Sequence, residues 1–174
     1  MFKENDKVVY PGYGVATIER VVTKNIAGKS SQFFELKFVN NDMTVLVPVA
    51  QADSVGIRPL SSQQQVVDLL EMLSQSSACI KNREGTQINW NKRNKEYQEK
   101  LRSGNLSELC SVYRDLKIME QKKDLSFGEQ RMLLATENII VEELSLVTNK
   151  TKESMMGQLR MLITVSSGQR EKQG

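Results

Sequence analysis

The amino-acid composition of this 174-residue chain changes abruptly near Leu60. All three prolines and four of the five phenylalanines precede that point, in a stretch rich in Val, Thr and Gly. Turn residues recur there about every eight to twelve positions, which is typical of an all-β domain. Beyond Leu60 the helix-favouring residues Gln, Glu, Leu, Lys and Met predominate. We therefore predict an α+β protein with an all-β domain over residues 1–60, a compact helical bundle over residues 61–165 and a disordered tail over residues 166–174.

Alternating hydrophobicity predicts the strands of the first domain. Apolar and polar residues alternate over residues 34–38 and again over Met43–Val47, which is the period of a strand with one buried face. Further strands are expected over Asp6–Tyr10 and Gly14–Val22. Four or five short strands in a domain of this size predict a curled sheet or an SH3/Tudor-like barrel.

Pro48 marks the end of the Met43–Val47 strand. Because proline has no N–H to donate to a sheet, its position suggests an edge strand. An apolar edge strand is either covered within the protein or offered to a partner that adds a strand of its own, and the residues alone leave both possibilities open.

Capping residues divide the second domain into helices. Ser62, Asn89 and Asn105 are N-cap candidates, and Ser126 with Glu129 forms a capping-box pattern. Three helices are predicted to begin after Ser62, Asn105 and Ser126. Two more are predicted over Trp90–Ser103, which ends at Gly104, and over Thr151–Val165, and a polar loop is predicted over Ser76–Asn89. The adjacent Glu142 and Glu143 point in different directions on such a helix, so we expect a solvated surface rather than an acid–base pair.

The absence of histidine and the scarcity of cysteine argue against an enzyme. The chain has no His, so it cannot form a Ser-His or Cys-His nucleophile pair or a His-ligated zinc site. Cys79 and Cys110 lack the CxxC spacing of a thiolate metal site, and Cys110, among apolar residues, is expected in the core. The run Ala27–Ser30 resembles the end of a phosphate-binding loop, but Thr23 replaces its first glycine, and a hairpin turn explains Gly28. We predict no cofactor and no metal.

The chain also lacks the signals of membrane insertion and export. No apolar run approaches the length of about 20 residues that crosses a bilayer, and the first ten residues carry charges where a signal peptide would need an apolar region. We therefore expect a cytoplasmic protein with reduced cysteines and no membrane partner.

The positive charge is concentrated around the only tryptophan, Trp90. Residues 81–102 contain seven basic and three acidic side chains, a net charge of +4, whereas the whole chain carries +3. On a helix starting at Trp90, Tyr97 and Leu101 fall within about 20° of the tryptophan direction, and the lysines point to the other side. Two interpretations remain open. The side with Trp90, Tyr97 and Leu101 either packs into the core while the basic side faces solvent, or the helix contacts nucleic acid, with the indole inserted at a base step and the lysines on phosphates.

The sequence resembles the CarD/CdnL family of bacterial transcription regulators, whose amino-terminal module is shared with the transcription-repair coupling factor. Seven blocks carry the resemblance, in order and at the family's spacing. They are DKVVYPGYG (6–14), MTVLVP (43–48), SVGIR (54–58), NWNKR (89–93), LRSGN (101–105), RDL (114–116) and LSFGEQRM (125–132).

The resemblance implies a Tudor-like domain that binds the RNA polymerase β subunit, in a holoenzyme with the housekeeping σ factor, by pairing edge strands. The residues implied on that side are Lys24 and the strand Met43, Thr44, Val45, Leu46 and Val47. Leu46 stands where some members have an arginine, and Gln130 where some have a lysine.

For the helical domain, the resemblance implies contact with promoter DNA at the upstream edge of the melted bubble. The tryptophan that wedges into the minor groove in the family matches Trp90, and the two basic positions after it match Lys92 and Lys95. Arg93, which lies between these two lysines, is also predicted to bind DNA. Such binding is expected to be weak and largely independent of sequence, with the open complex as the favoured state. The alternative is a non-catalytic protein–protein adaptor that uses the edge strand and has no role in promoter melting.

Overall fold

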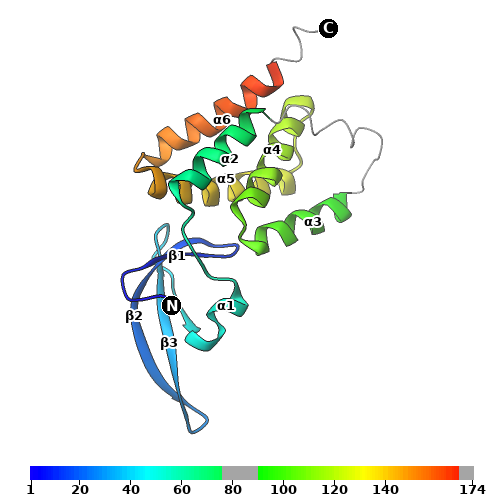
Figure 1. Cartoon of the computed structure of the whole chain (residues 1–174). Coiled ribbons are helices and arrows are strands. Elements are labelled where there is room, and N and C mark those ends of the chain that lie inside the picture. Colours follow the sequence, from blue (N-terminus) through cyan, green and yellow to red (C-terminus); the bar gives the residue numbers. More distant parts are fainter. Residues whose placement is uncertain (76–89, 169–174) are drawn as a thin grey trace. The chain divides into compact units, whose positions relative to one another are not determined.

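The structure is a computed structural model that describes residues 1–75 and 90–168 and divides at Leu60 into two compact units (Figure 1). The first unit, residues 1–60, is built on an antiparallel sheet, and the second, from Ser61 onward, is built from helices. This confirms the predicted α+β class with a β domain followed by a helical domain. None of the helices in these described residues is long and apolar enough to cross a bilayer.

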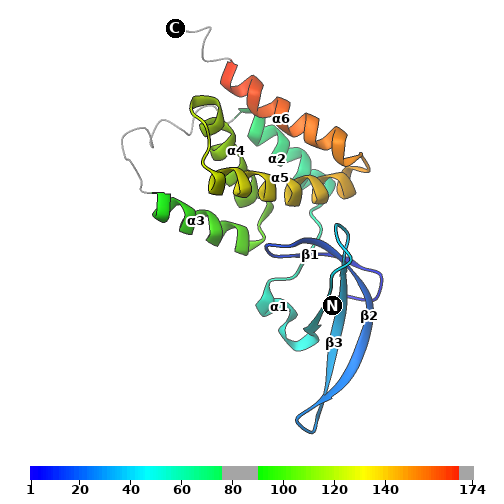
Figure 2. The ribbon, with the colours of Figure 1, turned by 180° about the vertical axis from the view of Figure 1, so that it is seen from behind.

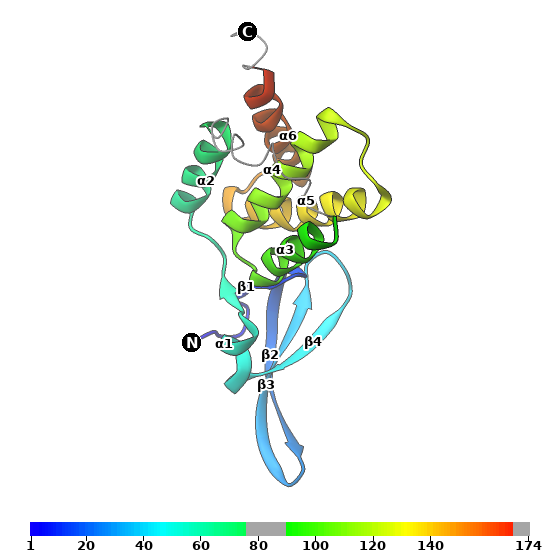
Figure 3. The same ribbon diagram turned by 90° about the vertical axis from the view of Figure 1, so that its right-hand side faces the viewer.

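The sheet has five strands in the order β4-β3-β2-β1-β5. They are β1 (Lys7–Tyr10), β2 (Gly14–Ile26), β3 (Lys29–Phe38), β4 (Thr44–Pro48) and β5 (Arg58–Pro59), with the short helices η1 (Val49–Gln51) and α1 (Ala52–Val55) between the last two strands. Every strand pair is antiparallel. Within the described chain β4 and β5 lie at opposite edges, so the sheet is open rather than a closed barrel, and Figure 3 shows β4 beside β3.

The predicted alternation of side chains forms the core of this unit. Phe34, Leu36 and Phe38 are buried on one face of β3, packed with residues such as Ile18 of β2 and Val47 of β4. Because strand side chains alternate, the intervening residues form the other face of the sheet.

The β2–β3 hairpin extends well past the end of β4. Strand β2 continues four residues beyond the predicted Val22, because it pairs with β3 up to the contact of Ile26 with Lys29. Ala27 and Gly28 then turn the chain with φ angles of 53° and 79°, a two-residue turn of the kind that suits the right-handed twist of hairpin strands. The structure thus confirms a hairpin turn at Gly28 rather than a phosphate-binding loop, and Figure 1 shows the hairpin as a long projecting arm.

The described part of the second unit contains five helices. They are α2 (Gln63–Gln75), α3 (Trp90–Ser103), α4 (Leu106–Lys122), α5 (Phe127–Thr148) and α6 (Lys152–Gly168). Helix α6 ends three residues beyond the predicted Val165. The predicted loop over Ser76–Asn89, its Asn89 cap, Cys79 and residues 169–174 of the predicted tail lie outside the described residues.

Three of the predicted caps form the expected hydrogen bonds. The Gln65 amide donates to the Ser62 hydroxyl at 3.2 Å, and the Ser107 amide donates to the Asn105 side chain at 2.9 Å. At α5 the Glu129 amide donates to Ser126 Oγ at 3.3 Å while the Ser126 amide donates to the Glu129 carboxylate at 2.8 Å, which completes the capping box. These bonds satisfy amides that the first turn of a helix leaves unpaired.

Helix α5 is the central element of the second unit. It lies behind α2 and α4 in Figure 1 and in front of them in Figure 2, and its Ile140 and Leu144 join the buried cluster that α4 and α6 complete. Cys110 is fully buried in this cluster, as predicted.

The predicted solvated surface at Glu142 and Glu143 is wrong, because both side chains are only 1% exposed. The Glu143 carboxylate accepts hydrogen bonds from the Ser61 amide at 2.9 Å and from the Ser61 hydroxyl at 2.8 Å. The first residue of the helical unit is therefore fastened to the later part of α5.

Candidate functional site

Trp90 is the first residue of α3 and is half-buried. A Cβ atom placed on Gly128 would lie 3.5 Å from Cζ2 of the indole, so the ring packs against the first turn of α5. This is an ordinary van der Waals distance, so the ring would also contact a small side chain at position 128 without a clash. The indole is therefore neither sealed in the core nor fully exposed, and part of its surface can meet a ligand.

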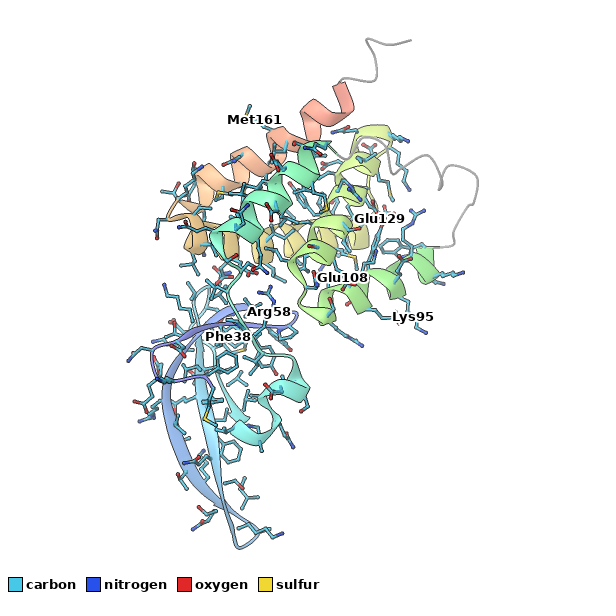
Figure 4. All side chains as sticks on the ribbon, viewed as in Figure 1. Phe38, Arg58, Lys95, Glu108, Glu129 and Met161 are labelled. Atoms are coloured by element: carbon cyan, nitrogen blue, oxygen red, sulfur yellow. The ribbon has the colours of Figure 1, made fainter. Side chains whose placement is uncertain are left out.

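The remainder of α3 has the two faces that its helical period predicts. Tyr97 is 1% exposed and Leu101 is half-buried on the side of the tryptophan. Lys92, Lys95 and Arg102 are exposed, and Figure 4 shows Lys95 pointing away from the helix. The structure thus places a basic surface on the same helix as a partly exposed indole.

Arg93 differs from the two neighbouring lysines. It is half-buried, and its Nη1 donates to the sulfur of Met119 on α4 at 3.7 Å. Lys100, one turn after Glu96, pairs with that carboxylate at 3.3 Å. Of the four residues predicted on the DNA side, Lys92 and Lys95 therefore lie on the exposed face of the helix that Trp90 begins, whereas Arg93 also contacts α4.

The predicted partner-binding strand lies at an edge of the sheet. Val47 is buried, Met43 and Val45 are half-buried, and Thr44 and Leu46 are exposed. The amide of Phe38 donates to the Met43 carbonyl at 3.1 Å, so alternate residues along β4 bond to β3.

That alternation directs the backbone N–H groups of Thr44 and Leu46 to the open side of the strand. Pro48 occupies the next outward position, where its missing N–H costs the sheet no hydrogen bond. The strand therefore offers a short row of outward backbone groups.

Lys24 lies on the same face of the sheet as Leu46, although the two residues are not neighbours. Lys24 pairs with Ser31 of β3, and Leu46 pairs with Glu35, four residues further along the same strand. Residues four apart on a strand share a face. Lys24 itself is exposed on the projecting hairpin.

Analysis of the sequence alone missed an exposed aromatic residue, Phe127, at the start of α5. Its side chain is 76% exposed, and Cζ of Arg131 lies 5.7 Å from the centre of its ring. The helical period contained a signal, because Phe127 lies half a turn away from the fully buried Thr136 and thus opposite the buried stripe of α5.

Three ionisable groups with shifted pKa values, Tyr113, Glu137 and Arg160, form a structural cluster. The Glu137 carboxylate accepts hydrogen bonds from the Tyr113 hydroxyl and from Nε and Nη2 of Arg160, each at 2.7 Å. Burial opposes ionisation of Glu137, but the bonds from Arg160 and Tyr113 outweigh it and hold the pKa of that carboxyl below its ordinary value. Burial, with the bond to Glu137, raises the pKa of Tyr113. The cluster joins α4, α5 and α6, and its hydrogen bonds account for the shifts without a catalytic role.

Among the described residues no group of three His, Cys, Asp or Glu side chains is placed to hold a metal ion.

Comparison with known families covers nearly the whole chain. Residues 69–160 match the CarD C-terminal domain, and residues 2–61 match the CarD-like/TRCF RID domain. The chain belongs to the CarD family. The resemblance inferred from the seven blocks is thereby confirmed, and the family matches point to a transcription factor that interacts with RNA polymerase rather than to an enzyme.

One full-length relative is a Bacillus subtilis (strain 168) protein named "Putative transcription factor YdeB". It is 26% identical over 155 residues, which cover 89% of this chain and 97% of the relative. The alignment therefore includes both units. The roles of individual residues at either interface remain predictions.

Proposed function

We propose that this CarD-family protein binds the β subunit of RNA polymerase through its sheet unit and stabilises the open promoter complex through its helical unit, acting in the cytoplasm. The observation that carries the proposal is the position of Trp90. A half-buried indole at the start of a helix, followed by exposed lysines, has the chemistry of an apolar wedge between phosphate contacts.

The edge of β4 supports the proposed polymerase contact. Its outward N–H groups can pair with an edge strand of a partner, a recognition mode in which main-chain bonds supply affinity and side chains supply specificity. The exposed Leu46 adds apolar area beside those groups, and Lys24 adds a positive charge on the same face.

The proposed DNA contact is weak on its own. Affinity for phosphates depends on the number of cations, and dissociation constants for nonspecific binding are roughly 10⁻⁴–10⁻⁶ M. Binding to polymerase raises the effective concentration of the helical unit near promoter DNA to about the millimolar range, at which such affinities suffice.

The wedge shifts an equilibrium and requires no catalysis. If the indole binds only the opened junction, its interaction energy favours the open complex over the closed complex. A preference of about 1.4 kcal/mol changes that equilibrium tenfold.

The first test is the lifetime of open promoter complexes with holoenzyme and the variant Trp90→Ala. We expect the variant to fold and to bind polymerase but to shorten that lifetime about tenfold relative to the unsubstituted protein. The variant Lys95→Gln should shorten the open-complex lifetime less than Trp90→Ala does. Because it removes one phosphate contact, its effect should become larger as the salt concentration falls. Lys100→Gln is the matched control, since Lys100 already pairs with Glu96. Unchanged lifetimes with retained polymerase binding would favour the adaptor alternative.

A second test separates strand pairing from side-chain contact at β4. Leu46→Pro removes an outward N–H but no bond to β3, so we expect it to abolish retention of the polymerase β subunit while the sheet remains folded. Leu46→Arg keeps the N–H and should retain the β subunit. Equal retention by both variants would contradict pairing at this edge.

A further inference from the structure

The ring of Phe127 is mostly exposed and does not belong to the hydrophobic core of the helical unit. Burying a side chain of this size is worth about 1.5–3 kcal/mol, yet 76% of the Phe127 surface faces solvent. Apart from Met1, it is the most exposed large apolar side chain among the described residues. The guanidinium of Arg131 lies over the ring, with Cζ 5.7 Å from the ring centre. A cation over one face of an exposed ring leaves the other face open to a second flat group.

Phe127 immediately precedes Gly128, the residue that the Trp90 indole contacts. Gly128 meets the indole, and consecutive Cα atoms are about 3.8 Å apart. Neighbouring residues of a helix point about 100° apart, so the phenyl ring lies beside the indole contact rather than beneath it. The two aromatic residues thus belong to one end of the helical unit.

The charge around Phe127 favours an anionic partner. Lys122, Lys123 and Arg131 lie within five residues of it and are exposed. Of the two acids in this stretch, Asp124 is exposed, whereas Glu129 is 4% exposed and faces Lys123 at 3.8 Å. An open aromatic face among cations is the combination with which proteins bind single-stranded nucleic acid.

We propose that Phe127 is a second aromatic contact of the DNA surface, on which an unpaired base next to the Trp90 junction stacks while Arg131 holds the ring and faces the backbone phosphates. This inference rests on the proposed junction contact of Trp90. It assigns the two rings different tasks: Trp90 meets the end of the duplex, and Phe127 takes the first base that leaves it. Stacking on a phenyl ring tolerates any base, so the contact requires no particular sequence.

The test compares binding of the full chain to two fluorescein-labelled DNAs at low salt, a fork with unpaired arms and a blunt duplex of equal charge. We expect Phe127→Ala to bind the fork about tenfold more weakly and the duplex unchanged. Phe127→Tyr should retain fork binding. Leu134→Ala is the matched control, because Leu134 is 55% exposed on the same face of α5 but two turns further from Trp90. Thermal unfolding of each variant verifies its fold.

A fork with abasic sites in place of the unpaired bases completes the experiment. The unsubstituted protein should bind it about tenfold more weakly than the normal fork, and Phe127→Ala should bind both forks equally. Equal fork binding by Phe127→Ala and the unsubstituted protein, with a loss in Trp90→Ala, would overturn this inference alone. No preference of the unsubstituted protein for the fork would overturn the junction contact as well. Loss of polymerase retention by Phe127→Ala with unchanged fork binding would identify a protein contact instead and overturn the stacking role.

Discussion

Each unit of this protein contains an arginine that pairs with a glutamate through two hydrogen bonds, and the two pairs differ in their surroundings. In the sheet unit Arg20 contacts Glu35 at 3.0 and 3.1 Å, with 65% of the arginine side chain and 15% of the glutamate side chain exposed. In the helical unit Arg160 contacts Glu137 at 2.7 Å through Nε and Nη2, with 49% of the arginine and 3% of the glutamate side chain exposed, and the Tyr113 hydroxyl is a third donor. The first pair joins two strands at the surface, whereas the second joins two helices and its glutamate is more deeply buried and bonded to a third helix.

We expect burial of the carboxylate and the number of its donors to decide what each pair contributes. An exposed pair gains little because water solvates both charges nearly as well, while loss of one partner from a buried pair leaves polar groups unsatisfied. The sheet unit depends instead on its ladder and one apolar face. The helical unit depends on carboxylates placed inside it, since all four buried glutamates among the described residues lie on α5.

The largest expected effect separates the two pairs directly. Glu137→Gln should lower the free energy of unfolding of the helical unit by about 2–3 kcal/mol, because it weakens charged hydrogen bonds and leaves Tyr113 poorly satisfied. Urea unfolding followed by the fluorescence of Trp90, the only tryptophan, measures it. Glu35→Gln is the control and should leave that transition in place. Similar shifts from both variants would contradict the role of burial.

The same pair predicts how acid affects the helical unit. The pKa of Glu137 is lowered by the bonds from Arg160 and Tyr113 despite burial, so its stabilising contribution is complete above the unfolded value of about 4.3 and is lost as the pH falls through the folded value. The difference in unfolding free energy between Glu137→Gln and the unsubstituted protein should therefore shrink below about pH 4.3. A difference independent of pH from 7 to 3 would show that shape, rather than charge, sets the effect.

A smaller effect is expected at the capping box of α5. Ser126→Ala removes the acceptor for the Glu129 amide and should lower the free energy of unfolding by about 1 kcal/mol. Ser107→Ala in the first turn of α4 is the control, since it keeps the backbone amide that Asn105 caps. Urea unfolding followed by Trp90 fluorescence measures the free energy of unfolding of both variants. Equal losses of stability in the two variants would argue against a specific cap at Ser126.

In the sheet unit, the hairpin turn offers a stabilising change. Ala27 has a φ angle of 53°, a conformation that asparagine tolerates better than alanine. Ala27→Asn should slow amide exchange in the β2–β3 hairpin severalfold, corresponding to about 0.5–1 kcal/mol, and leave exchange in α5 unchanged. Faster exchange in the hairpin would contradict the turn type.

The last prediction concerns the reactivity of the Cys110 thiol, which can be measured without substituting this residue. Burial, with a contribution from Glu143, raises the pKa of the Cys110 thiol to about 12, so almost no thiolate exists at pH 8. In a Cys79→Ser background, a thiol reagent should modify Cys110 only after urea unfolds the helical unit. Rapid modification of the folded protein would show that this core opens readily.

Local patterns predicted a large part of the fold. Strand alternation over residues 34–38 and the caps at Ser62, Asn105 and Ser126 depend on neighbouring residues alone, and the sequence contains them in full. The ends of β2 and α6 were less predictable, because pairing partners and helix packing extend an element beyond its strongest local signal.

The buried glutamates could not be predicted because their partners are remote. Glu143 is satisfied by Ser61, and Glu137 by side chains on two other helices. The start of α3 at Trp90 and the exposed lysines after it were predictable from the helical period, whereas their role at DNA stays a prediction. Phe127 was missed because an aromatic residue inside a motif suggests packing, although the helical period places it opposite the buried stripe of α5 and its exposure in the folded chain agrees with that period.

The two bonds between Ser61 and Glu143 fix the first residue of the helical unit to α5. A force applied at Ser61 therefore enters this unit near the carboxy-terminal end of α5. From Glu143 back to Phe127 is sixteen residues, so a rigid helix carries that force across about 24 Å to the aromatic end. Within this unit, one helix therefore connects the residue that holds Ser61 to the exposed ring of Phe127.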